Sequence, residues 1–303
     1  MKTAWLYAGQ GSQRPGMGRD FYDAFPETRE IFESRAAGLD LRALCFDSDE
    51  ATLARTRYTQ PCMAAFAAAV TLLLRGAGLS PDYAAGLSLG EYSALHASGV
   101  FGYETLLALL AFRGLAMERS AAGVPSRMTA VLGLEADDVA RAVREASAVG
   151  VVSITNLNCP GQTVIGGEEG AVMTAESICL SLGAKRCMEL RTSGPFHTPL
   201  MENASVELQG RLDGTPFSPQ LAPVIFNATG EPAPDSDIRR LLCLGVRSPV
   251  LFEKTVRTLA ALGVESVIEI GPGRALTGFV RRTAPGIRVF TIESVRDFEN
   301  LRV

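Results

Sequence analysis

The chain has 303 residues, of which 47% are hydrophobic and 20% charged, so about two domains or one large domain with an insertion are expected. Its formal net charge is −4 and no basic block is present, which excludes the cationic surface typical of nucleic-acid binders. The longest apolar run, residues 62–74, is shorter than the ~18 residues of a membrane span, and we expect neither a membrane segment nor a signal peptide.

The first part of the chain alternates apolar runs with helical patterns. Residues 3–8 and 83–87 are predicted strands, and residues 20–39, 60–74, 88–96 and 103–121 are predicted helices. Pro61 is expected in the first turn of its helix, where its missing N–H is tolerated. Strands that alternate with helices predict the α/β class, with a parallel sheet covered on both faces.

The pattern changes near Gly123. Predicted strands cover residues 128–134, 151–156, 162–166 and 186–190, and predicted helices cover residues 137–148 and 170–182. Their order, βαββαβ, is the ferredoxin-like arrangement. The α/β pattern resumes after Ser193 and ends with a strand over 266–270 and a helix from Ala275. We therefore predict a large α/β domain, residues 1–123 and 191–303, with an inserted ferredoxin-like subdomain over residues 124–190.

The cysteines and histidines argue against a metal site. None of the six cysteines forms a C-x-x-C pair, and the chain has only two histidines, so we predict no bound metal. Reduced thiols in a cytoplasmic enzyme are the preferred interpretation. The cysteines are Cys45, Cys62, Cys159, Cys179, Cys187 and Cys243.

The strongest local signal is the sequence Gly-Leu-Ser-Leu-Gly at residues 86–90, a G-x-S-x-G pattern between a predicted strand and a predicted helix. In a nucleophile elbow the serine occupies a sharp turn that exposes its hydroxyl, and glycines beside it avoid a steric clash. The helix start behind Ser88 offers unpaired N–H groups and a positive dipole end, which suit a developing oxyanion. The alternative is an ordinary glycine-rich turn.

A serine nucleophile requires a base, and two histidines are available. His96 follows Ser88 by eight residues on the same predicted helix, ~12 Å along the axis, so we expect it to be structural or solvent-facing. His197 lies in a proline-punctuated loop where the chain re-enters the large domain, and by elimination it is the candidate base. No acid stands out as its partner, which weakens a general hydrolase interpretation.

Two further glycine clusters, at 9–11 and 271–273, do not match nucleotide-binding loops, because neither has the G-x-G-x-x-G register or a Gly-Lys-Ser/Thr sequence. The first cluster has an alternative use. Its backbone N–H groups are suited to donate to an oxyanion near the serine.

Seven motifs occur in order along the chain: GQGSQ at 9–13, GLSLGEYSAL at 86–95, Arg-Gly at 113–114, NCPGQTVIGG at 158–167, GPFHTPLM at 194–201, RSPVLFE at 247–253 and EIGPG at 269–273. Together they resemble, over essentially the whole chain, the malonyl-CoA:acyl-carrier-protein transacylases of bacterial fatty-acid synthesis and the related polyketide-synthase acyltransferases. The resemblance implies an α/β-hydrolase-like core with a ferredoxin-like insert. It also implies malonyl-CoA and acyl carrier protein as partners, no bound cofactor, and a coenzyme A thioester as substrate.

The resemblance assigns the chemistry residue by residue. Ser88 would be acylated by malonyl-CoA and would pass the malonyl group to the phosphopantetheine thiol of the carrier, in a ping-pong mechanism with His197 as the base. The backbone N–H groups of Gln10 and Leu89 would form the oxyanion hole. Arg113 matches the arginine that pairs with the malonyl carboxylate, a role that suits its planar fork of donors.

Phe196 and two departures from the family pattern concern selectivity and efficiency. Phe196 matches a bulky residue that would crowd a methyl-branched substrate, which predicts malonyl over methylmalonyl. Leu87 stands where the family usually has histidine. Gly245 stands where it usually has glutamine, whose backbone carbonyl orients the base, and glycine is expected to hold His197 less firmly.

Three alternatives remain open from the sequence. They are a serine thioesterase or acyl hydrolase on the same scaffold, a trans-acting acyltransferase of a polyketide pathway, and an inactive scaffold that only binds carrier protein. Arg113 discriminates, because a hydrolase for neutral acyl chains gains nothing from a buried cation. Acyl carrier proteins are acidic, so the docking surface is expected to be basic, with Lys185, Arg186, Arg191, Arg281 and Arg282 as candidates.

Overall fold

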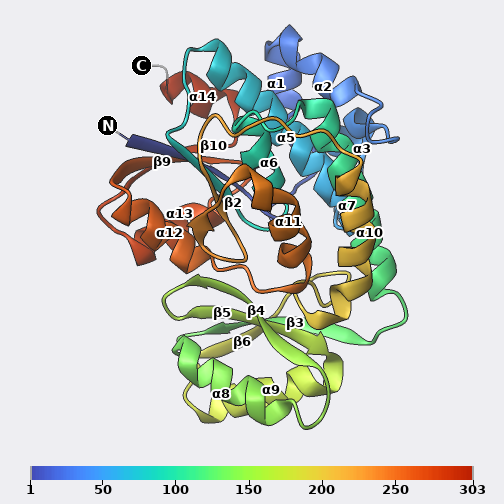
Figure 1. Cartoon of the computed structure of the whole chain (residues 1–303), viewed down its shortest axis with the longest axis vertical. Coiled ribbons are helices and arrows are strands. Elements are labelled where there is room, and N and C mark those ends of the chain that lie inside the picture. Colours follow the sequence, from blue (N-terminus) through green and yellow to red (C-terminus); the bar gives the residue numbers. More distant parts are fainter. Residues whose placement is uncertain (1, 302–303) are drawn as a thin grey trace.

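The computed structural model describes residues 2–301 and contains two separate β-sheets (Figure 1). The larger sheet has the strand order β10-β9-β1-β2-β7-β8, in which all neighbours are parallel except the short edge pair β7–β8. Its strands are β1 (Lys2–Tyr7), β2 (Tyr83–Gly86), β7 (Val224–Phe226), β8 (Glu231–Pro232), β9 (Val264–Ile270) and β10 (Arg288–Ile292).

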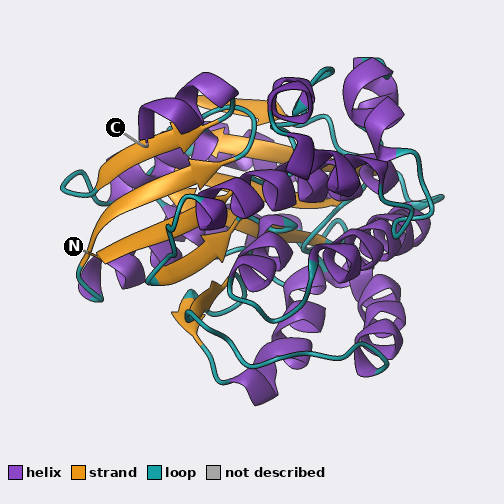
Figure 2. Ribbon diagram, turned by 90° about the horizontal axis from the view of Figure 1, so that it is seen from above, coloured by secondary structure: helices purple, strands orange, loops and turns teal. Residues whose placement is uncertain are grey.

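Helices cover this sheet on both sides (Figure 2). They are α1 (Arg19–Ala24), α2 (Arg29–Glu33), α3 (Leu41–Asp47), α4 (Glu50–Leu53), α5 (Thr56–Gly76), α6 (Gly90–Ala97), α7 (Tyr103–Ala121), α10 (Glu202–Asp213), α11 (Ile238–Arg247), α12 (Phe252–Ala261), α13 (Ala275–Thr283) and α14 (Val295–Leu301). Three short 3₁₀ turns, η1 (Pro26–Thr28), η2 (Pro199–Met201) and η3 (Asp235–Asp237), complete this part of the chain.

Strand β1 shows why the sheet is buried on both faces. Successive side chains of a strand point to opposite faces, and here both faces carry apolar groups. Trp5 and Tyr7 join the apolar cluster formed with α5 and α7, whereas Ala4 and Leu6 join the cluster formed with α12 and α13. The predicted α/β class with a parallel sheet is thereby confirmed.

The second sheet is antiparallel throughout and has the order β4-β5-β3-β6. Its elements appear in the predicted order βαββαβ: β3 (Ser126–Leu132), α8 (Ala136–Ala146), β4 (Val152–Cys159), β5 (Gln162–Glu168), α9 (Glu169–Ser181) and β6 (Arg186–Glu189). Val131 and Ile165 face α8 and α9, and the alternate residues Ala130 and Val164 belong to the core of the larger part. The small sheet is therefore packed on both faces, with its two helices on the outer side (Figure 1).

Three details of the sequence-based elements are corrected. The predicted helix over 20–39 is broken into α1, η1 and α2, because Phe25 precedes a proline and adopts an extended backbone, φ −125° and ψ 98°. Helix α5 begins at Thr56, so Pro61 lies inside the helix rather than in its first turn. The helix expected from residue 88 begins at Gly90, which leaves Ser88 in the turn itself.

Among residues 2–301, no helix combines the length and the apolar character that crossing a membrane demands.

Candidate active site

Ser88 lies in a tight turn at the carboxyl end of β2, between that strand and α6. Its φ is 55°, a left-handed backbone conformation that costs a non-glycine residue about 1–3 kcal/mol. A Cβ added to Gly86 would lie 2.1 Å from the Gly90 carbonyl oxygen, and one added to Gly90 would lie 2.3 Å from the Tyr7 carbonyl oxygen. The turn therefore requires both glycines of the G-x-S-x-G pattern.

The side chains of Ser88 and His197 meet although they are 109 residues apart in the chain, with Oγ 2.8 Å from Nε2. On the other side of the ring, Nδ1 lies 2.7 Å from the carbonyl oxygen of Gly245. Because a carbonyl oxygen only accepts, Nδ1 carries the ring proton and Nε2 accepts from the serine hydroxyl. A backbone carbonyl thus orients the imidazole in the position that an acid occupies in a Ser-His-Asp triad.

The imidazole of His197 is neutral at physiological pH. The residue is 5% exposed, and burial followed by the nearby charge of Arg113 lowers the pKa of His197 to about 4. A neutral imidazole with a free lone pair at Nε2 is the state that accepts a proton from a nucleophile.

Arg113, on α7, is a buried cation in direct contact with Ser88. Its side chain is enclosed, at 3% exposure, and its Nη2 donates to Ser88 Oγ at 3.2 Å. No acidic side chain within residues 2–301 forms an ion pair with it, and its Nε has no hydrogen-bond partner there. Leaving a desolvated guanidinium unpaired is costly, so the site is suited to a ligand that carries a carboxylate.

Two residues that hold Arg113 were not singled out from the sequence. Gln60, on α5, accepts from Arg113 Nη1 at 2.9 Å, and the Tyr92 ring lies under the guanidinium with 5.4 Å to its centroid. A signal for Gln60 was available: it lies just before the apolar run of α5, and buried polar groups require partners.

The backbone amides expected to form an oxyanion hole are free. Within residues 2–301, the N–H groups of Gln10 and Leu89 have no hydrogen-bond partner. Leu89 directly follows Ser88, and the Gln10 side chain is anchored by a 3.0 Å bond from its Nε2 to Thr56 on α5. Both amides are therefore free to donate to a ligand.

The remaining residues singled out from the sequence take different places. Phe196, which precedes His197 in the chain, is buried in the main apolar core, and Leu87 packs against the second apolar cluster. Gly245 lies in α11. His96 lies apart from the dyad, where its Nδ1 bonds the Phe101 carbonyl at 2.9 Å and ties α6 to the following loop.

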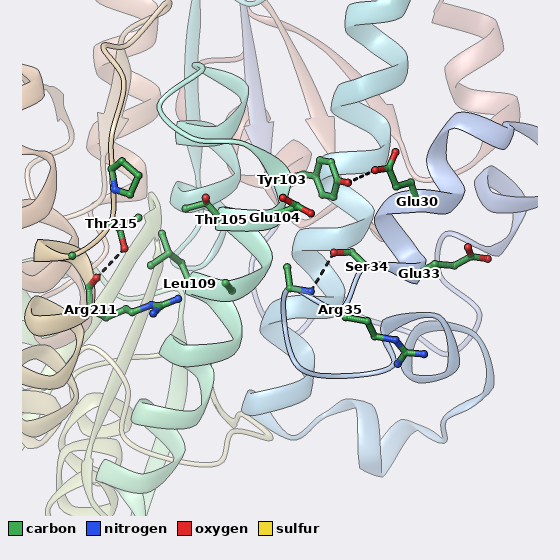
Figure 3. A pocket seen from close by; sticks show the side chains of 14 residues that line it. Glu30, Glu33, Ser34, Arg35, Tyr103, Glu104, Thr105, Leu109, Arg211 and Thr215 are labelled. Atoms are coloured by element: carbon green, nitrogen blue, oxygen red, sulfur yellow. Dashed lines mark hydrogen bonds between the residues drawn. The ribbon is translucent and has the colours of Figure 1, made fainter.

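One surface cavity lies apart from these residues. It has a volume of about 730 Å³ and opens between the α2–α3 connection, the start of α7 and the end of α10 (Figure 3). Exposed charged residues such as Glu33, Glu104 and Arg211 line it, and neither Ser88, His197 nor Arg113 does. Among the described residues no cluster of histidine, cysteine or carboxylate side chains is arranged to bind a metal ion, and all six cysteines are unpaired.

A buried Ser-His pair beside free backbone amides is the machinery of acyl transfer. The acyl transferase domain family matches residues 4–293, and the chain belongs to that family. The malonyl CoA-acyl carrier protein transacylase of Bacillus subtilis is 34% identical over 302 residues, which cover 98% of this chain and 95% of that protein. The protein of the same name from Synechocystis is also 34% identical, over 99% of this chain and all of its own length.

Solved structures agree with these relatives. The crystal structure of the Streptococcus pneumoniae enzyme abbreviated MCAT is 42% identical, covers 99% of both chains and superposes with a TM-score of 0.95. A malonyl-transacylase solved in complex with its type II polyketide-synthase acyl-carrier protein is 34% identical over 99% of this chain and 98% of its own, with a TM-score of 0.96. The resemblance inferred from the seven motifs is confirmed.

Proposed function

We propose that this chain transfers a malonyl group from malonyl-CoA to the phosphopantetheine thiol of an acyl carrier protein, through a malonyl-Ser88 intermediate. The observation that carries the proposal is the buried, unpaired guanidinium of Arg113, which lies 3.2 Å from Ser88 Oγ. A malonyl thioester brings a carboxylate to within two carbons of the reacting carbonyl. The names of the relatives, malonyl CoA-acyl carrier protein transacylases, support the same assignment.

In the first half-reaction, Ser88 Oγ attacks the thioester carbonyl while His197 Nε2 takes the hydroxyl proton. The carbonyl oxygen becomes an oxyanion, which the free N–H groups of Gln10 and Leu89 bind. The carbon–sulfur bond then breaks, and the departing coenzyme A sulfur receives the proton from His197. The products are malonyl-Ser88 and the free thiol of coenzyme A.

In the second half-reaction, the carrier thiol gives its proton to His197 Nε2 as its sulfur attacks the malonyl ester. The same amides bind the oxyanion, and the bond to Ser88 Oγ breaks. The proton returns from His197 to Ser88, which restores the free enzyme and leaves malonyl on the carrier. The coenzyme A thioester is a substrate, and the scheme requires no bound cofactor or metal.

The type of carrier defines a second candidate function. A relative of the same fold is solved with a type II polyketide-synthase carrier, so transfer within a polyketide pathway remains a variant of the proposal. Arg113 disfavours a thioesterase for neutral acyl chains, because such substrates leave the guanidinium unpaired. Phe196, buried beside the base, supports malonyl over methylmalonyl, a discrimination of about 1–3 kcal/mol for one methyl group.

Fold and location form part of the proposal. We assign residues 1–123 and 191–303 to an α/β-hydrolase-like domain and residues 124–190 to a ferredoxin-like subdomain. The antiparallel order β4-β5-β3-β6, with both helices on one face, supports the second assignment. The cysteine usage supports a cytoplasmic location.

Intact-mass measurement tests the function. Wild-type protein mixed with malonyl-CoA is expected to gain the mass of one malonyl group and to lose it when holo-acyl carrier protein is added. Ser88→Ala should gain nothing. Ser93→Ala, which removes another buried serine hydroxyl close by on α6, should behave as wild type. No adduct and no turnover on wild type would indicate an inactive scaffold, and release of malonate without carrier would indicate a hydrolase.

A further inference from the structure

The strained backbone of Ser88 is held by a side chain from another strand. Asn227 Oδ1 accepts the N–H of Ser88 at 2.7 Å, and Asn227 Nδ2 donates to the carbonyl of Gly86 at 2.7 Å. The side-chain amide of Asn227 therefore bridges the turn: it binds Gly86, the last residue of β2, and Ser88. Because both bonds are short and the Asn227 side chain that makes them is buried, they oppose relaxation of the turn from its left-handed conformation.

The position of Asn227 explains this fit. Strand β7 runs parallel to β2, with Ala84 opposite Val224 and Ala85 opposite Ile225, and it ends at Phe226. Asn227 is the next residue, at the level where the chain leaves β2 and enters the turn. Its side chain supplies a donor and an acceptor at the point where backbone pairing between the two strands stops.

Asn227 is itself fixed by the first turn of α6. Its backbone N–H donates to Glu91 Oε1 at 2.6 Å, and its carbonyl accepts from the N–H of Leu251 at 2.8 Å. Asn227 and Glu91 are 2% and 3% exposed, so neither bond competes with water. Glu91 follows Ser88 by three residues, and the turn, the helix start and the end of β7 form one closed hydrogen-bonded unit.

The backbone N–H groups of Ser88 and Leu89 are adjacent but have different partners. The N–H of Ser88 is used by Asn227, whereas the N–H of Leu89 has no partner within residues 2–301. We propose that Asn227 is a positioning residue for acyl transfer: its side chain holds the Ser88 backbone so that Oγ faces His197 and the Leu89 amide faces the oxyanion, and Glu91 holds Asn227 in place.

The inference rests on the proposed function only for the choice of substrate, so its test uses two acylating agents. One is malonyl-CoA with holo-acyl carrier protein. The other is a small neutral fluorophosphonate, which labels a serine activated by a base and an oxyanion hole and has no carboxylate for Arg113. If the malonyl assignment fails, wild type will not transfer malonyl, and the fluorophosphonate rates still test the role of Asn227.

Asn227→Leu, which removes both side-chain bonds at similar volume, is the main variant. We expect kcat for malonyl transfer to fall about 100-fold or more, KM for malonyl-CoA to change less than threefold, and fluorophosphonate labelling to slow in parallel. Asn227→Asp keeps an acceptor opposite the Ser88 N–H and loses the donor to Gly86, so a smaller loss, of about tenfold, is expected. Glu91→Leu removes the acceptor for the Asn227 N–H, so kcat should fall in the same direction as in Asn227→Leu, by about tenfold.

Thr28→Val is the matched control, because it removes the two hydrogen bonds that one buried hydroxyl donates to the carbonyls of Phe21 and Phe25, away from the turn. It should lower the melting temperature without changing kcat. If Asn227→Leu does not fold, Asn227→Asp decides alone: a tenfold loss of kcat at constant KM supports the role, and wild-type kcat overturns it. A folded Asn227→Leu protein with wild-type kcat and labelling rate, or one that resembles the control, also overturns it.

Discussion

Arg113 donates a hydrogen bond to the Oγ of Ser88 at 3.2 Å, on an atom that also lies 2.8 Å from His197 Nε2. The serine hydroxyl therefore gives its proton toward the imidazole and accepts from a buried cation at the same time. Both contacts stabilise negative charge on the oxygen as its proton leaves. In the proposed reaction Arg113 would therefore act on two groups, the Ser88 oxygen and the carboxylate of the substrate.

Substituting Arg113 should change substrate choice more than general activity. In Arg113→Gln the malonyl carboxylate loses its charged partner, which costs about 2–4 kcal/mol and lowers kcat/KM for malonyl-CoA roughly 30- to 1000-fold. Acetyl-CoA has no carboxylate, so its kcat/KM should change less than about fivefold. The measurement is the ratio of kcat/KM values for the two thioesters.

The control for this variant is Arg119→Gln, on the same helix. Arg119 is an exposed partner of Glu207, and its removal should leave the ratio unchanged. Equal losses for malonyl-CoA and acetyl-CoA in Arg113→Gln would mean that the guanidinium does not recognise the carboxylate.

The pH dependence of Ser88 acylation should reflect the lowered pKa of His197. A protonated imidazole cannot accept the serine proton, so acylation falls as pH decreases through the pKa of the folded protein. Because burial and then Arg113 lower that pKa to about 4, the acid limb should lie near pH 4 rather than near 6.5. The position of this acid limb is measured from the rate of labelling by a neutral fluorophosphonate, at about ten pH values between about pH 3.5 and 8.

Arg113→Gln provides the second arm of this experiment. It removes one of the two causes that lower the pKa of His197, so the acid limb should move toward higher pH. A wild-type limb at pH 6.5, or no movement in the variant, would contradict the electrostatic coupling between Arg113 and the base.

Local sequence patterns predict several helices and the turn around Ser88, but they do not predict the side-chain contacts between distant elements. The helix over 103–121 and the turn around Ser88 follow from apolar periodicity and from two glycines that admit no Cβ. The break at Pro26 is also local, and the residue before a proline was its signal. By contrast, the bond from Gln60 to Arg113 joins residues 53 positions apart, and only the packing of α5 against α7 creates it.

The contacts of Asn227 could not be predicted from the sequence either. It follows a strand of three residues, too short for a periodic pattern, and its partners Ser88 and Glu91 lie 139 and 136 residues away. The sequence around it, Phe-Asn-Ala-Thr-Gly, is typical of a turn. Its contact with the nucleophile depends on the order of strands in the sheet, which local periodicity does not determine.

Glu91 should make stability fall as pH rises. Burial raises the pKa of Glu91 to about 7, against the opposing effects of the Asn227 N–H and of Arg113. The folded state therefore binds a proton that the unfolded state releases above pH 4.5, so this contribution is complete at low pH and is lost as pH rises through about 7. The loss amounts to at most about 3 kcal/mol.

Glu91→Gln isolates this effect, since glutamine is neutral at every pH. The free energy of unfolding from urea titration should be similar for variant and wild type at pH 5, and greater for the variant at pH 8. Taking the difference at each pH cancels the opposite contribution of His197, whose lowered pKa makes stability fall toward acid pH. A difference that does not depend on pH would show that Glu91 is already ionised in the folded protein at pH 5.

Gly245 and Gly114 should respond in opposite ways to alanine. A Cβ on Gly245 would meet only Glu91 Oε2, at 3.6 Å, and glycine within a helix such as α11 costs about 0.5–1 kcal/mol relative to alanine. Gly245→Ala should therefore raise the free energy of unfolding by that amount. The carbonyl that orients His197 then belongs to a less flexible residue, and kcat should be unchanged or higher.

Gly114→Ala is the matched variant on α7. Its Cβ would lie 2.7 Å from the Thr56 carbonyl oxygen and 3.0 Å from the Cα of Arg57, and neither is a group that can rotate away. Overpacking of this kind costs about 1–3 kcal/mol and should separate α7 from α5, which displaces Arg113. Urea unfolding and kcat/KM for malonyl-CoA check both variants. Destabilisation by Gly245→Ala would mean that the glycine itself is required beside Glu91, because no backbone contact in the structure forbids a methyl group there.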